Sequence, residues 1–77
     1  MPNLPRTSGK EVLRGLAELN CIVLRQTGSH VRVERHKGDR MLLSTVPLHK
    51  TVPVGTLAKI LRDLEITPEE FIAALKG

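Results

Sequence analysis

Three histidines are the side chains best suited to chemistry in this 77-residue sequence, namely His30, His36 and His49. Histidine has an ordinary pKa of about 6.5, so it can accept or donate a proton near neutral pH. His30 and His36 lie six positions apart in a stretch that alternates like a β-strand, which separates them by about 20 Å. They therefore cannot share one metal ion, and the chain has a single cysteine, so we predict no metal site.

A single histidine can carry a reaction when the substrate supplies its own nucleophile. RNA does so through the ribose 2′-hydroxyl, and one general acid or base contributes about 10²- to 10⁴-fold to the rate. Nearby cations could hold the phosphate and stabilise its developing charge. Arg32 shares the predicted strand face of His30, while Lys37 and Arg40 flank the next turn. Gly28 has no side chain and could let an RNA backbone come close.

The histidines also have simpler interpretations. His30 could be an ordinary residue of an exposed polar strand face, because such faces are common in antiparallel sheets. We interpret His36 as an exposed residue at a strand end. His49 either lies near His30 at the end of the sheet or only anchors its proline-containing loop, and we favour the structural role.

The charge of the chain is unevenly distributed. The formal net charge is +4, from 12 basic and 8 acidic residues, and residues 1–40 contain eight of the basic residues against four acidic ones. A one-sided basic excess suits a polyanionic partner such as nucleic acid. A domain of this size buries only about 60% of its unfolded surface, so its core is thin. We expect one domain over residues 1–77 that meets a macromolecule on an outer face and needs no small-molecule cofactor.

The single cysteine and the hydropathy pattern argue against a disulfide-bonded, secreted or membrane-spanning protein. Cys21 can form no internal disulfide, and its apolar neighbours indicate a small buried residue rather than a nucleophile. Nothing resembles a secretory leader, and no apolar run approaches the roughly 20 residues of a membrane span. We therefore expect a cytoplasmic protein without membrane contact.

The pattern of apolar residues predicts six elements after an irregular lead-in at residues 1–7. Ser8 and Glu11 form a capping box for a helix over residues 9–19, which Asn20 ends in a left-handed conformation. Thr67, Pro68 and Glu70 are the start signals of the last helix. Between them we predict strands at 21–26, 29–36 and 40–46, a loop at 47–53 and a helix at 54–64.

Strict alternation in the second strand orients the predicted sheet. Val31 and Val33 share one face, whereas His30, Arg32, Glu34 and His36 share the other. Short glycine-containing links between the strands favour hairpins. The sequence thus predicts an α+β fold of order α-β-β-β-α-α, in which the helices pack on one face of a three-stranded antiparallel sheet and His30 lies on the open face.

Several segments, in order, resemble the HicA family of toxins. They are residues 8–13 at the first helix start, 25–30 (R-Q-T-G-S-H), 46–49 (V-P-L-H), 55–61 (G-T-L-A-K-I-L) and 67–71 (T-P-E-E-F). The sequence departs from the family at Asn20-Cys21, where glycine and a large aromatic residue are usual, and at Val52-Pro53, which replace more polar residues.

The resemblance implies a fold similar to that of double-stranded-RNA-binding domains and an activity of mRNA cleavage. It implies that the histidine of G-S-H, here His30, is catalytic, and that a HicB-type antitoxin binds the toxin and blocks its site. With this resemblance, the RNA-contacting set that we predict consists of Arg25, Gly28, Ser29, Arg32, Lys37 and Arg40.

The main alternative is an RNA-binding module without catalytic activity. Single-strand readers stack bases on aromatic side chains, and Phe71 is the only aromatic residue here. A module that reads the shape of double-stranded RNA remains open, because such domains pair helices with a small sheet.

Overall fold

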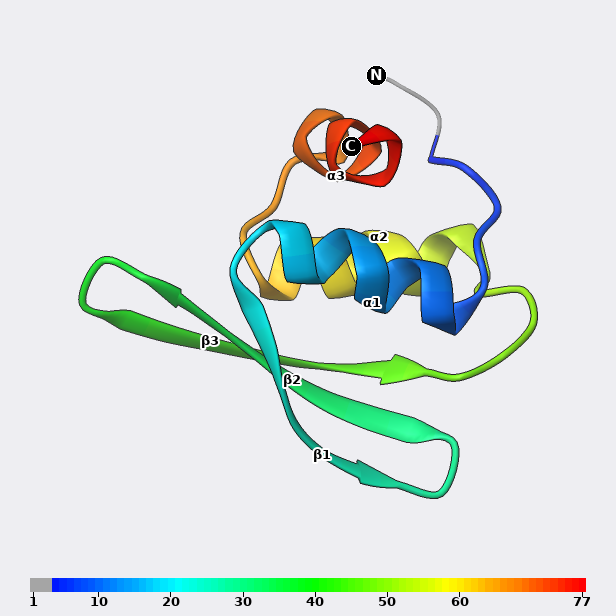
Figure 1. Cartoon of the computed structure of the whole chain (residues 1–77), viewed down its shortest axis with the longest axis horizontal. Helices are drawn as coiled ribbons and strands as arrows, with labels where there is room; N and C mark the ends of the chain where they lie inside the picture. Colours follow the sequence, from blue (N-terminus) through cyan, green and yellow to red (C-terminus); the bar gives the residue numbers. More distant parts are fainter. Residues whose placement is uncertain (1–3) are drawn as a thin grey trace.

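A computed structural model describes residues 4–77 of the chain, so the first three residues of the predicted lead-in lie outside the described part. It has the predicted element order (Figure 1). The elements are α1 (Gly9–Glu18), β1 (Cys21–Thr27), β2 (His30–Lys37), β3 (Arg40–Pro47), α2 (Val54–Asp63) and α3 (Pro68–Lys76). The predicted α+β class is therefore confirmed.

Local start and stop signals act as the sequence predicts. The Glu11 N–H donates to the Ser8 hydroxyl at 3.1 Å, and the Glu11 carboxylate accepts from the Ser8 N–H at 3.0 Å. Asn20 ends the first helix with a φ of 65°. The same reciprocal box forms between Thr67 and Glu70 at the start of α3. These contacts are local in sequence, and for this reason the residues alone could predict them.

The three strands form an antiparallel sheet in the order β1-β2-β3. Two-residue turns join them, and in each turn the first residue is a glycine with positive φ: 59° at Gly28 and 62° at Gly38. Left-handed backbone is easiest for glycine, and a glycine at the first turn position is typical of type II′ hairpins. Each strand ends one residue later than predicted, and Ser29 belongs to the first turn instead of to β2.

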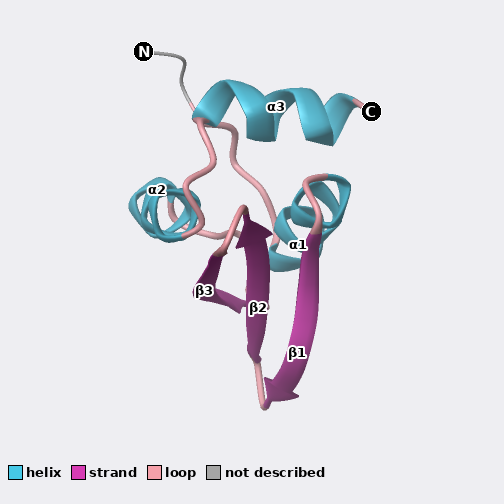
Figure 2. Cartoon of the chain, turned by 90° about the vertical axis from the view of Figure 1, so that its left-hand side faces the viewer, coloured by secondary structure: helices cyan, strands magenta, loops and turns pink. Residues whose placement is uncertain are grey.

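All three helices lie on one side of the sheet in two layers (Figures 1 and 2). α1 and α2 pack on the sheet, and α3 lies across them as the outermost element. The aromatic ring of Phe71 is fully buried and approaches α1 at Gly15, where a Cβ would be only 2.8 Å from the ring. The side chain that is absent at Gly15 thus allows α3 to close over the first helical layer.

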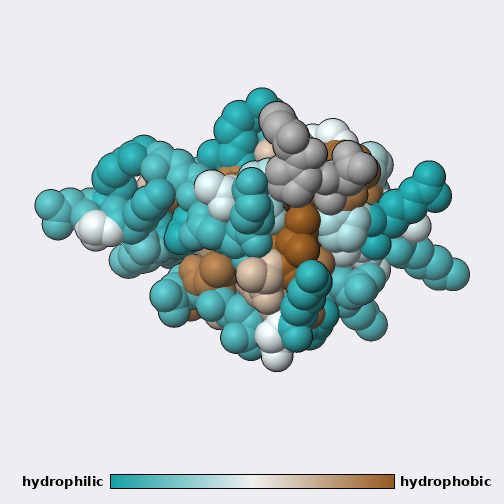
Figure 3. Space-filling view, turned by 90° about the horizontal axis from the view of Figure 1, so that it is seen from above, coloured by the Kyte–Doolittle hydropathy of each residue, from teal (hydrophilic) through white to brown (hydrophobic). Residues whose placement is uncertain are grey.

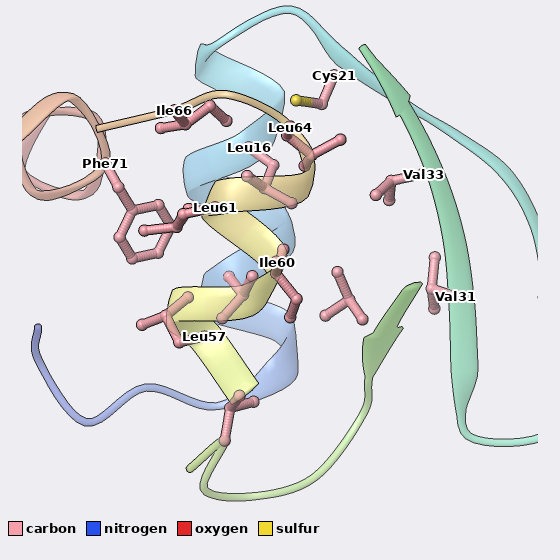
Figure 4. Packing of buried hydrophobic residues seen from close by; sticks show 13 residues of the cluster. Leu16, Cys21, Val31, Val33, Leu57, Ile60, Leu61, Leu64, Ile66 and Phe71 are labelled. Carbon is pink, nitrogen blue, oxygen red and sulfur yellow. The ribbon is translucent and has the colours of Figure 1, made fainter. Parts of the chain in front are cut away.

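The core lies between the sheet and the helices. Val31 and Val33 point from β2 toward the side chains of α1 and α2, among them Leu16 and Ile60 (Figure 4). Burying each such aliphatic side chain contributes about 1.5–3 kcal/mol. Seen from the α3 side, the molecule is mainly hydrophilic, with apolar side chains in patches (Figure 3). With the valines turned inward, alternation places His30 on the uncovered face of the sheet, as predicted.

Candidate functional site

His30 is exposed at the first position of β2, directly after the turn at residues 28–29. A Cβ built on Gly28 meets no atom within 4 Å, so its positive φ accounts for glycine at this position. The space beside Gly28 is open, and close approach of an RNA backbone remains a prediction. The turn thus presents His30 at the tip of the first hairpin.

The loop that follows β3 returns to the same end of the sheet (Figure 1). The Leu48 N–H donates to the Ser29 carbonyl at 2.7 Å, which attaches the loop to the hairpin turn. The Gly9 N–H donates to the His49 carbonyl at 2.9 Å, which attaches it to the start of α1. These contacts bring the exposed His49 ring to a centroid distance of 6.5 Å from His30, with an interplanar angle of 74°.

Both features that were offered as alternatives for His49 are present in the structure. Its backbone does anchor the loop, as the structural interpretation holds, and its ring also lies near His30 at the sheet end. Anchoring through a carbonyl and presenting an imidazole are therefore compatible. The V-P-x-H spacing after the third strand was the available signal, but it could not locate the loop in space.

Two arginines lie directly opposite each other on the open face beside His30. Arg25 in β1 is the register partner of Arg32 in β2. The Arg32 guanidinium donates to the Thr45 hydroxyl at 3.1 Å, and none of the ion pairs among residues 4–77 includes either arginine. Like charges facing each other across strands are destabilising. An anion bound between them would remove this repulsion, as expected for a phosphate-binding surface.

Lys37 and Arg40 lie at the other end of the sheet. Lys37 is seven positions from His30 along β2, or roughly 23 Å. Both cations pair with the Glu65 carboxylate, Arg40 at 2.5 Å and Lys37 at 3.6 Å. These contacts lower the pKa of the Glu65 carboxyl, and the hydrogen bond from Arg40 is the largest cause. The structure thus brings together His30, Arg25, Gly28, Ser29 and Arg32, and leaves Lys37 and Arg40 outside this group.

Arg35 joins β2 to the end of α2 at this second end of the sheet. It points to the helical side, where its guanidinium donates to the carbonyls of Leu64 and Glu65 at 2.8 and 3.0 Å. A cation at the C-terminus of a helix satisfies free carbonyls and the helix dipole. The cations at this end therefore have carboxylate or helix-carbonyl partners, whereas Arg25 and Arg32 beside His30 have no acidic partner within residues 4–77.

His36 differs from the other two histidines in its surroundings. Its ring contacts the carboxylate of Glu34, which is 7% exposed although it lies on the open face. Ile22 and Leu43, the register partners of Glu34, flank it from the neighbouring strands. His36 is exposed near a strand end, as predicted. Sequence reasoning missed its contact with Glu34, although the predicted alternation placed both residues on the same strand face and so was the available signal.

The single cysteine is placed in the core, away from the surface around His30. Cys21 is buried, and burial raises the pKa of its thiol, although the Arg35 charge opposes this shift. It is the small core residue that the sequence predicted.

No group of three or more His, Cys, Asp or Glu side chains in the described part of the chain is arranged to hold a metal ion. Within residues 4–77, no helix has the length and apolar character needed to cross a membrane.

Comparison with known proteins indicates a family for this chain. Residues 9–66 match the model of a family described as "HicA toxin of bacterial toxin-antitoxin". The matched range contains all three strands, α1, α2, the first hairpin turn and the loop of His49. No curated protein and no solved structure matches the chain significantly.

Proposed function

Because the chain belongs to the HicA family, the toxins of bacterial toxin–antitoxin systems, we propose that it is an endoribonuclease that cleaves mRNA with His30 as a catalytic residue. The observation that carries this proposal is the exposed imidazole of His30 beside two opposed arginines that have no acidic partner among the described residues. An mRNA substrate places the action of the toxin in the cytoplasm.

In the proposed reaction the RNA provides the nucleophile. The 2′-oxygen attacks the adjacent phosphorus, the bond from phosphorus to the 5′-oxygen breaks, and the products are a 2′,3′-cyclic phosphate and a free 5′-hydroxyl. His30 moves one of the two protons that this transfer requires. Arg32 and Arg25 hold the phosphate and stabilise its additional charge. The step needs no metal ion and no cofactor.

A HicB-type antitoxin is the partner that we propose for the same face. The uncovered sheet surface around His30 is basic, so a partner with an acidic surface would associate rapidly and cover the site. Electrostatic steering of this kind weakens with added salt. Inhibition by such a protein should therefore be competitive with RNA.

The test is cleavage of an end-labelled mRNA fragment by pure protein in the presence of a chelator. Wild-type protein should cleave, and His30→Gln should be slower by about 10²- to 10⁴-fold while remaining folded. His36→Gln is a suitable control, since it removes an exposed histidine at the far end of the same strand. Binding without cleavage by the wild type under all conditions would favour the RNA-binding module instead.

A further inference from the structure

The second histidine at the sheet end has no structural task that requires an imidazole. Its carbonyl accepts from Gly9, and the preceding residue donates from its backbone to Ser29. Both contacts are independent of the side chain at position 49, which is exposed. Among the three histidines, only His36 hydrogen-bonds to another protein side chain within residues 4–77. The rings of His30 and His49 are therefore both available to a ligand.

The distance between these two rings suits a single phosphate. In an in-line displacement, the attacking and leaving oxygens lie on opposite sides of phosphorus. A base and an acid must each come within about 2.6–3.2 Å of one of these oxygens. Two imidazoles with centroids 6.5 Å apart and planes inclined by 74° can flank one phosphate, whereas His36 is too distant to reach it.

We propose that His49 is a second catalytic residue and forms an acid–base pair with His30. This inference rests on the proposed function. One imidazole takes the proton from the 2′-hydroxyl as the new bond from oxygen to phosphorus forms. The other, in its protonated form, gives a proton to the 5′-oxygen as the old bond breaks. One proton is accepted and one is donated, so the pair ends with its protonation states exchanged, and water restores them.

The close packing and backbone attachments of the loop support this role. A Cβ on Gly9 would lie 2.2 Å from the Pro47 carbonyl oxygen, so α1 and the loop are packed as closely as glycine allows. A second attachment joins Thr7 and Val52, where the Val52 N–H donates to the Thr7 carbonyl at 2.7 Å. Catalytic groups need such fixed placement, because small displacements reduce the rate strongly.

The charged groups around the pair favour an anionic substrate between the rings. The one carboxylate near the start of α1, that of Glu11, is engaged by the Ser8 N–H. Lys50 adjoins His49 in sequence, and Arg25 and Arg32 lie on the strand face of His30. Lys10 and Glu11 follow Gly9 at the start of α1. Glu34 is on the same face of β2 four positions from His30, and its carboxylate contacts His36.

The experiment combines a pH profile with a modified substrate. Cleavage rates of wild type, His30→Ala and His49→Ala are measured on a short RNA from pH 5 to pH 9, with circular dichroism as the folding control. A second RNA has sulfur in place of the 5′-bridging oxygen at the cleavage site, because a thiolate leaves without being protonated. His49→Asn, which cannot titrate, repeats each measurement in a variant with a polar side chain.

The expected wild-type profile is bell-shaped, and each alanine variant should lose one limb and about 10²- to 10⁴-fold in rate. The sulfur substrate should restore the rate of one variant and not of the other, which identifies the acid. The inference is overturned if His49→Ala cleaves at the wild-type rate. It is also overturned if the variant is slower on both substrates by the same factor with an unchanged bell shape, as a purely structural role would give. If the wild type binds this RNA without cleaving it, the proposed function fails and the inference fails with it.

Discussion

Replacement of Gly9 by alanine tests how the site is held together. Alanine is a better helix former than glycine, so propensity alone would stabilise the protein by at most about 1 kcal/mol. The structure predicts the opposite sign. The new Cβ would lie 2.2 Å from the Pro47 oxygen and 2.7 Å from the Leu48 Cα, and neither backbone atom can move without displacing the loop.

The magnitude follows from two costs and one gain. Overpacking at a close contact costs about 1–3 kcal/mol. Loss of the hydrogen bond from the Gly9 N–H to the His49 carbonyl costs about 0.5–1.5 kcal/mol. After subtraction of a helix-propensity gain of about 1 kcal/mol, we expect a destabilisation of about 0.5–3.5 kcal/mol. For a domain of this size each kcal/mol lowers Tm by about 4–8 °C.

The assay is urea unfolding of Gly9→Ala beside a matched control, Gly55→Ala. Gly55 is also near a helix start, but a Cβ there meets no atom within 4 Å, so its replacement should be neutral or stabilise by about 0.4–1 kcal/mol. Gly9→Ala should also lose RNA cleavage beyond its effect on folding, because His49 moves with the loop. A Gly9→Ala protein as stable as the Gly55→Ala control would refute the claim that close packing at Gly9 holds the loop against α1.

Other predictions concern packing, charge and pH. Gly15→Ala should destabilise by about 1–3 kcal/mol in urea unfolding, since its Cβ would lie 2.8 Å from the Phe71 ring. Arg32→Ala should weaken RNA binding and reduce its salt dependence by about one unit of slope, and the loss should exceed that of Arg40→Ala, whose guanidinium is already paired with Glu65; titrations at several salt concentrations measure both. The pKa of Asp63 is lowered below its ordinary value of 3.8, chiefly by the hydrogen bond from Lys59 and also by that from Ser44. A carboxyl whose pKa is lowered by folding stabilises the fold at pH values above its ordinary pKa, and this stabilisation is lost as the pH falls through the lowered pKa. Asp63→Asn should therefore flatten the dependence of stability on pH below about pH 4. Equal slopes for the two proteins in acid unfolding would contradict this.

The sequence was sufficient for features that depend on near neighbours. The capping boxes at Ser8 and Thr67, the stop at Asn20 and the inward alternation of Val31 and Val33 all arise from contacts or periodicity within a few residues. Periodicity also placed His30 on the open face, because one valine-bearing face of β2 had to be buried.

The sequence could not predict features that depend on distant contacts. The Gly9 N–H donates to the His49 carbonyl forty positions away, and the Leu48 N–H donates to the Ser29 carbonyl. These two distant contacts place His49 beside His30, and nothing local in the sequence indicates them. Lys37 and Arg40 were predicted to contact RNA together with Arg32, yet Glu65 lies next to them in the fold. A positive charge in a sequence does not reveal whether it is already neutralised.

The most direct test of the central claim compares wild type and His30→Gln in metal-free cleavage of one defined mRNA, with product ends identified by mass spectrometry. The account predicts 2′,3′-cyclic phosphate ends from the wild type and a rate about 10²- to 10⁴-fold lower for the folded variant. Equal rates for the two proteins, or cleavage by the wild type only when a metal ion is added, would contradict it.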